Sequence, residues 1–176
     1  MPLRYVDDCT WEQVFAWWRS NEEHLEHWRE FYTQQGYSSW EEWRRPKIEK
    51  FNCENLDWQI FEIKGVNTIL DFHGGPFSGW VKAVYEGRSM PTFREMMDHP
   101  WISSQPTVRE ISENFPEDTI LTGLSCSPRG IYVIEGMHRS AAVALAIKEG
   151  RDIRSQVMIA LAVTPYSKLL DILKLA

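Results

Sequence analysis

The chain of 176 residues has few cysteines, no long apolar run and no surplus of positive charge. Its three cysteines, Cys9, Cys53 and Cys126, are never spaced as Cys-x-x-Cys, which argues against a disulfide framework and a structural zinc site and favours a reducing compartment. The longest apolar run, residues 141–147, is far shorter than the roughly 18 residues that a membrane-spanning helix needs. We therefore expect a cytoplasmic protein without a membrane partner.

Basic residues are also scarce, because 19 Lys and Arg stand against 25 Asp and Glu and the net charge is −6. The segments before and after residue 50 carry the same excess of acidic residues, so neither is a basic tail or a basic half. Binding to the phosphate backbone of a nucleic acid depends on clustered Lys and Arg side chains. We therefore expect no nucleic-acid partner.

Aromatic residues, in contrast, make up 13% of the chain, and six of the nine tryptophans lie within residues 11–43. An apolar stripe at helical spacing runs through residues 11–18. A capping box at residues 39–42 predicts a second helix, which we expect Pro46 to end. Tryptophans at helical spacing usually lie in a core, so residues 1–50 are predicted to form a Trp-rich helical layer fastened to the rest of the chain.

Strands and helices alternate in the remainder of the chain. The predicted elements are strands at residues 58–63, 119–125, 131–134 and 157–163, and helices at residues 79–86, 138–149 and after Pro165. The pattern predicts an α+β fold. Since no low-complexity linker interrupts it, we expect a single domain over residues 1–176, with residues 51–176 as its α+β body.

The sharpest chemical motif runs from Glu135 to Ser140, where a predicted strand turns into a buried helix. Gly136 lets the backbone turn, and the free N–H groups at a helix start attract anions. His138 and Arg139 add two potentially cationic side chains in the first turn. The spacing therefore predicts a phosphate or carboxylate site. The alternative is that these two side chains pair with acidic neighbours such as Glu135 and only tie the helix to the sheet.

Residues 131–142, which run from this strand into the Ala-rich helix, resemble the core motif of the ParB/sulfiredoxin superfamily. In that superfamily a strand, a Gly-x-(His/Arg)-Arg turn and an Ala-rich helix form a nucleotide phosphate site. The likeness covers about residues 120–163, roughly a quarter of the chain. It implies a ParB/sulfiredoxin-like mixed sheet with packed helices.

The resemblance also implies roles for individual residues. Gly136 would allow close approach of a phosphate, His138 and Arg139 would hold phosphoryl oxygens, and Ser140 would complete the cradle. Glu135 would be a catalytic base or a Mg²⁺ ligand, and His138 a second catalytic group. The implied function is a transferase that moves a phosphoryl group from ATP, or another nucleoside triphosphate, to a small-molecule acceptor.

Two departures from the family pattern narrow the possible reactions. Sulfiredoxins carry a cysteine between the glycine and the histidine, whereas this chain has Met137, so repair of sulfinic acids is not expected. Chromosome-partitioning ParB proteins add a helix-turn-helix domain, for which this acidic chain leaves no room after Val163.

Two alternatives to phosphoryl transfer remain open. One is a non-catalytic module that binds a nucleotide or anion and presents the Trp-rich helices to a partner, and the other is a ParB-like nuclease or DNA-binding protein.

A second candidate loop contains Asp71, His73, Gly74 and Gly75. Its glycines can expose backbone N–H groups to an anion, and its two titratable side chains can serve acid–base chemistry. Such loops are more often simple turns whose glycines supply positive φ angles. Asp71 and His73 become relevant to the chemistry only if the fold brings them close to Glu135.

Overall fold

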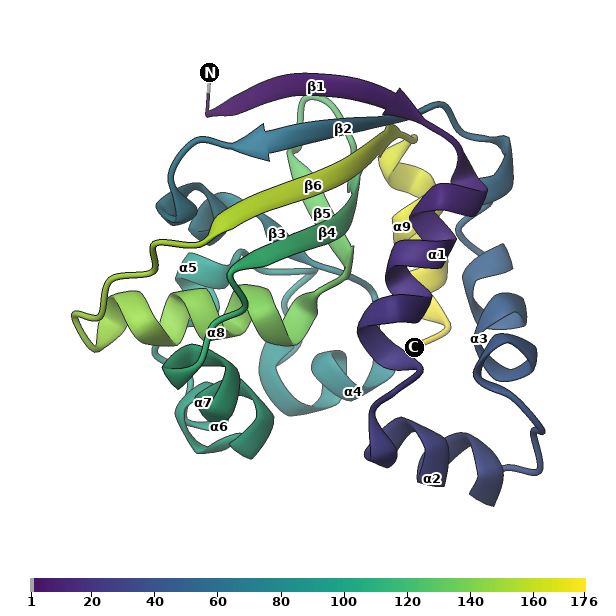
Figure 1. Cartoon of the computed structure of the whole chain (residues 1–176), viewed down its shortest axis with the longest axis horizontal. Helices are drawn as coiled ribbons and strands as arrows, with labels where there is room; N and C mark the ends of the chain where they lie inside the picture. The colour runs from purple at the N-terminus through teal and green to yellow at the C-terminus, as the bar shows by residue number, and fades with distance from the viewer. Residues whose placement is uncertain (1) are drawn as a thin grey trace.

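A computed structural model describes residues 2–176 of the chain (Figure 1). At its centre is a mixed sheet with the strand order β1-β2-β6-β4-β5-β3. The strands are β1 (Leu3–Cys9), β2 (Trp58–Ile63), β3 (His73–Gly74), β4 (Asp118–Ser125), β5 (Ile131–Glu135) and β6 (Gln156–Val163). The pairs β4–β6 and β3–β5 are parallel, and the other neighbours are antiparallel. The predicted α+β class is confirmed.

Helices surround this sheet. The α-helices are α1 (Trp11–Glu22), α2 (Glu26–Gln34), α3 (Trp40–Glu49), α4 (Ser78–Trp80), α5 (Phe93–Met96), α6 (Pro100–Ser104), α7 (Pro106–Glu113), α8 (Met137–Lys148) and α9 (Tyr166–Lys174). The other helical turns are the 3₁₀ helices η1 (Cys53–Asn55) and η2 (Val66–Asp71) and the π-helix η3 (Val81–Tyr85). In Figure 1, α8 runs below the sheet, α6 and α7 lie beyond α8, and α1, α2 and α3 gather to one side. Within residues 2–176, no helix is both long enough and apolar enough to cross a membrane.

Aromatic rings fasten the N-terminal helices to the sheet, as their spacing predicted. Trp11 of α1 contacts Trp58 of β2 with ring centroids 5.6 Å apart, and Phe15 contacts Trp40 of α3 at 5.2 Å. Trp40 and Trp18 are fully buried. Burial of rings of this size dominates the packing energy of a small core, so α1 and α3 are held on the start of β2.

The prediction that this layer is wholly helical was wrong, because Leu3–Cys9 forms the edge strand β1 against β2. Most of its side chains are exposed, so the strand lacks the alternation of apolar and polar residues that would have predicted it. Pro46 lies inside α3 and does not end it. Trp43 and Ile48, on either side of Pro46, are both buried, and their packing offsets the lost backbone hydrogen bond.

The predicted helix over residues 79–86 changes character within its length. It begins as α4 and continues as the π-helix η3, after which Glu86 adopts a left-handed conformation with φ of +50°. π-Helical turns occur frequently at functional sites. Here the turn places the buried side chain of Tyr85 toward the loop that follows β3.

The segment that carries the sharpest motif has the predicted structure. Strands β4 and β5 form an antiparallel hairpin, and β5 leads through Gly136 into α8, which is buried along most of its length. Gly136 has φ of +93°, and a Cβ atom there would lie 2.4 Å from Cδ2 of Leu121 on β4. Glycine is therefore required both by the turn and by the close approach of this turn to the sheet.

Candidate functional site

Helix α8 begins at the end of β5 without a side-chain cap. The Ser140 N–H donates to the Gly136 carbonyl over 2.9 Å, which is the first hydrogen bond of the helix. The N–H groups of the preceding residues in the first turn have no acceptor within the helix. Because the positive end of the helix dipole lies at the same point, an anion can bind here through backbone groups alone.

Arg139, in contrast, is held in a buried polar network. Its guanidinium forms a 2.5 Å ion pair with Glu135 and donates to Thr119 Oγ1 and, over 3.0 Å, to the Ile120 carbonyl. The Asn21 amide at the end of α1 donates to the other oxygen of Glu135 over 3.3 Å. The Glu135–Arg139 pair and its hydrogen bonds thus connect α8 to β4, β5 and α1. This is the structural role that the sequence left open as the alternative to ligand binding. Only part of the guanidinium remains available to a ligand.

Burial raises the pKa of the Glu135 carboxyl, and the nearby Glu22 raises it further, while Arg139 and Asn21 act in the opposite direction. A carboxylate with a raised pKa accepts a proton more readily at neutral pH. Each oxygen of Glu135 already accepts one hydrogen bond, from Arg139 or from Asn21. Residues 2–176 also contain no cluster of three or more His, Cys, Asp or Glu side chains arranged to hold a metal.

His138 differs most from its expected role. Its ring meets Trp80 edge-on, with the centroids 5.4 Å apart. Burial lowers the pKa of His138 to about 4, and the nearby charges of His27 and Arg139 lower it in the same direction. The imidazole is therefore neutral at pH 7 and does not attract a phosphate as a fixed cation. A neutral imidazole has one nitrogen that donates a hydrogen bond and one that accepts, so the ring can bond to a polar ligand.

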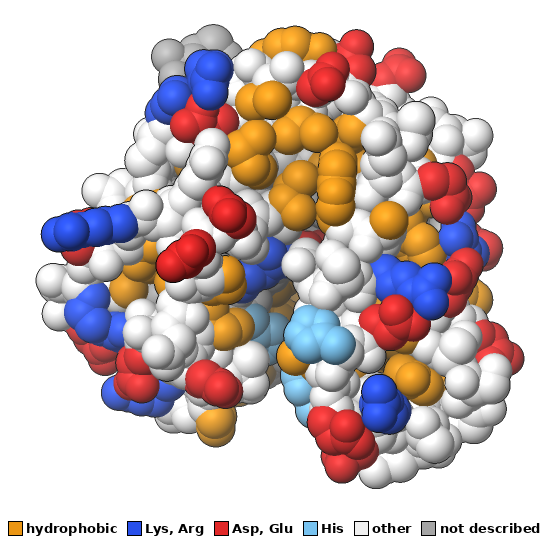
Figure 2. All heavy atoms as spheres, viewed as in Figure 1, with side chains coloured by type: hydrophobic (Ala, Val, Ile, Leu, Met, Phe, Trp, Pro, Cys, Tyr) orange, Lys and Arg blue, Asp and Glu red, His pale blue; other side chains and the backbone are white. Residues whose placement is uncertain are grey.

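A hollow in the molecular surface lies in front of this motif. In Figure 2 the face is hollowed between the side formed by α6 and α7 and the side formed by α1 and α2, with histidine and Lys or Arg side chains in its depth. Individual contacts place residues from these elements around His138. Trp101 of α6 contacts Trp80 at 4.9 Å, and His27 of α2 is close enough to shift the pKa of His138. The hollow therefore joins segments that lie far apart in the sequence.

The second candidate loop meets the start of α8 through its glycines. The Gly75 N–H donates to Sδ of Met137 over 3.3 Å, and the Tyr85 hydroxyl donates to the Gly75 carbonyl over 2.6 Å. A Cβ atom on Gly74 would lie 2.3 Å from the Tyr85 hydroxyl oxygen. The two glycines are therefore explained by close packing against Tyr85 and Met137.

The titratable side chains of that loop have other partners. Asp71 is exposed and forms an ion pair with Arg94 over 2.8 Å. His73 stacks on Tyr132 with ring centroids 4.5 Å apart. In the described part of the chain, neither side chain has a hydrogen bond or ion pair with Glu135, so no such contact links the loop to that carboxylate.

Ser140, at the end of the first turn of α8, is fully buried, and its hydroxyl has no hydrogen-bond partner within residues 2–176. Buried polar groups without partners are rare in folded proteins.

Sequence analysis missed several residues that complete the site, and no local motif marks them. They are Asn21, Trp80, Tyr85, Trp101 and Thr119.

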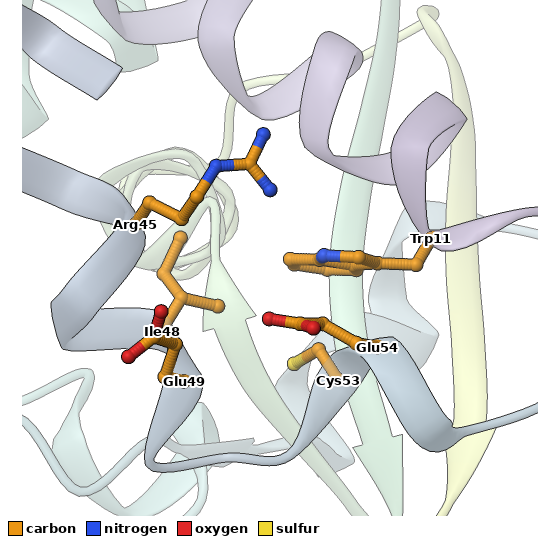
Figure 3. A pocket seen from close by; sticks show the side chains of 6 residues that line it. All are labelled: Trp11, Arg45, Ile48, Glu49, Cys53 and Glu54. Atoms are coloured by element: carbon orange, nitrogen blue, oxygen red, sulfur yellow. The ribbon is translucent and has the colours of Figure 1, made fainter. Parts of the chain in front are cut away.

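Two other depressions lie apart from this motif. Figure 3 shows a crevice beside Trp11, toward which the Arg45 and Glu54 side chains point, and it is too narrow to hold a water molecule. A broader groove of about 530 Å³ also borders Trp11 and is lined by residues 8–11 and 56–59. Neither includes any residue of the motif at the start of α8.

No protein-family model, curated protein or solved structure matches this chain. The resemblance to the ParB/sulfiredoxin superfamily therefore remains an expectation from the sequence of about residues 120–163.

Proposed function

We propose that the chain binds the phosphate groups of a nucleotide at the start of α8 and transfers a phosphoryl group from ATP to a small-molecule acceptor in the cytoplasm. The observation that carries this proposal is the uncapped helix start at the hollow, with the ring of His138 in the first turn of the helix. The likeness of residues 131–142 to a superfamily nucleotide site supports a nucleotide as the source of the phosphate.

In this proposal the backbone N–H groups of the first turn bind phosphoryl oxygens, and the neutral His138 donates one further hydrogen bond. These donors are fixed by the fold, and fixed donors stabilise the charge that develops on the transferred group. The acceptor oxygen attacks the γ-phosphorus, its proton passes to Glu135, and the bond from phosphorus to ADP breaks. The Glu135 oxygen bonded to Asn21 at 3.3 Å is held less closely than the one paired with Arg139, so it receives the proton. We assign no residue of this chain to Mg²⁺.

Calorimetric titration with ATP and with tripolyphosphate tests the phosphate site. We expect both ligands to bind the wild type, and His138→Ala to weaken both by roughly 2- to 13-fold, which is the loss of one neutral hydrogen bond. His24→Ala is the matched control, because His24 is exposed on the turn before α2. Arg139→Ala is a poorer test, since it leaves the buried Glu135 without its partner. The proposal is wrong if the wild type binds neither ligand.

The closed Glu135–Arg139 pair favours a second function, a non-catalytic nucleotide-binding module. In that case ATP binds without turnover, whereas the transferase releases ADP in molar excess over protein. Glu135→Gln should stop turnover and preserve ATP binding if Glu135 is the base. A partner of such a module would not contact Trp18, Trp40 or Trp43, because all three are buried.

A further inference from the structure

An aromatic row leads from the surface to the start of α8. Trp101 of α6 is partly exposed and meets Trp80 edge-on at 4.9 Å, and Trp80 in turn meets the ring of His138 at 5.4 Å. The rings of Trp101 and His138 therefore lie no more than about 10 Å apart. The row thus starts in α6 and ends in the first turn of α8.

Polar groups also lie within this row. Trp80 is only 6% exposed and carries an indole N–H. The imidazole ring of His138, which meets Trp80 edge-on, adds a second potential donor. Both groups can form hydrogen bonds with a polar ligand that lies against the row.

The position of Trp101 is held from two directions. Its backbone N–H donates to Nδ1 of His99 over 3.1 Å, which caps α6. The same His99 ring lies 3.3 Å from a carboxylate oxygen of Glu86. With the backbone fixed by this cap and the ring packed on Trp80, the partly exposed indole presents a preorganised surface. Such a surface loses little conformational entropy when a ligand binds to it.

We infer that Trp101 is the surface on which the base of the bound nucleotide stacks, so that the site takes nucleotides in preference to inorganic phosphates and sugar phosphates. The inference rests on the proposed function, because it uses the phosphate position at the start of α8. An indole face stacks on any nucleobase, and a ribose with its phosphates bridges the interval between Trp101 and His138. The Trp80 N–H then donates to an oxygen of the ribose or of the nearest phosphate.

Calorimetry with ATP, adenosine and tripolyphosphate on the full chain tests this inference. Trp101→Leu keeps apolar bulk against Trp80 but removes the ring face, so we expect ATP affinity to fall roughly 5- to 150-fold. Tripolyphosphate affinity should not change. Trp101→Phe retains a ring and should keep most of the ATP affinity. Trp28→Leu is the matched control, because Trp28 is also partly exposed but packs on Trp43 in the N-terminal layer.

The outcomes separate the stacking role from the phosphate site, provided that thermal unfolding shows each variant to be folded. Unchanged ATP affinity in Trp101→Leu, or an equal loss for ATP and tripolyphosphate, would overturn the stacking role and leave the phosphate site in place. Adenosine binding that depends on Trp101, without any binding of tripolyphosphate, would overturn the proposed function and support stacking. If none of the three ligands binds, both proposals are wrong.

Discussion

The neutral state of His138 makes the stability of the protein depend on pH in a way that one substitution can isolate. Burial against Trp80 lowers the pKa of His138 from 6.5 to about 4 in the folded state. Between these two pH values the unfolded chain binds a proton that the folded chain does not bind. Acidification therefore favours unfolding: the loss of stability begins as the pH falls below 6.5 and is complete below about pH 4.

The size of this effect follows from the interval between the two pKa values. Since one pH unit is worth about 1.4 kcal/mol, the full interval corresponds to about 3 kcal/mol of unfolding free energy, of which most should be lost by about pH 4.5. Glu135 acts in the opposite direction, because its pKa is raised and protonation of the folded state relieves a cost. The comparison must therefore be between two proteins that both contain Glu135.

His138→Gln removes the titrating ring and leaves a neutral polar side chain of similar length. Urea unfolding followed by tryptophan fluorescence should be measured for both proteins from about pH 7.5 to about pH 4.5 at constant ionic strength. We expect the stability difference to change by about 2–3 kcal/mol over this range in favour of the variant. His24→Gln, which changes an exposed histidine, should follow the wild type. Parallel pH profiles for the wild type and His138→Gln would refute the reasoning.

Two further positions at the start of α8 and one in α3 can be tested by chemical denaturation. Arg139→Ala leaves Glu135 buried and unpaired and should cost about 3–5 kcal/mol at neutral pH, whereas the double variant with Glu135→Gln should recover a large part of that loss. Gly136→Ala forces a Cβ atom to within 2.4 Å of Leu121 at φ of +93° and should cost about 1–3 kcal/mol. Lys47→Met removes a sealed ammonium that has no hydrogen-bond partner within residues 2–176 and lies 4.5 Å from the ring centroid of Trp43. Because Met keeps the apolar packing on this ring, the variant should be at least as stable as the wild type.

Local sequence patterns predicted the elements whose apolar residues follow one clear period. The β4–β5 hairpin, the apolar helix α8 and the buried strand β6 all formed where periodicity indicated. The sequence pattern did not predict strand β1. An exposed edge strand needs no apolar face, and this one contains Asp7 and Asp8. The prediction that Pro46 ends the helix was wrong for a related reason. Burial of neighbouring side chains outweighed the backbone hydrogen bond that the proline removes.

The site was predictable in its backbone but not in its side-chain chemistry. A glycine between a strand and an apolar helix marks a turn that the local sequence specifies by itself. Gly136 adopts the left-handed conformation expected at such a turn. The ionisation of His138 depends instead on Trp80, which comes from a distant segment. Asn21, which donates a hydrogen bond to Glu135, is separated from it by 114 positions in the sequence. No local motif can reveal such a contact.

These contacts change how an anion would be attracted to this acidic chain. Two cations were expected at the helix start, but His138 is neutral at pH 7 and the charge of Arg139 is balanced by Glu135. The local attraction must therefore come from the unpaired N–H groups and the dipole of α8 rather than from net charge. An anion bound beside His138 would also raise the pKa of the ring, because a neighbouring negative charge stabilises the protonated form. Proton uptake and anion binding at this site are then coupled, and each favours the other as the pH falls from neutral toward 4.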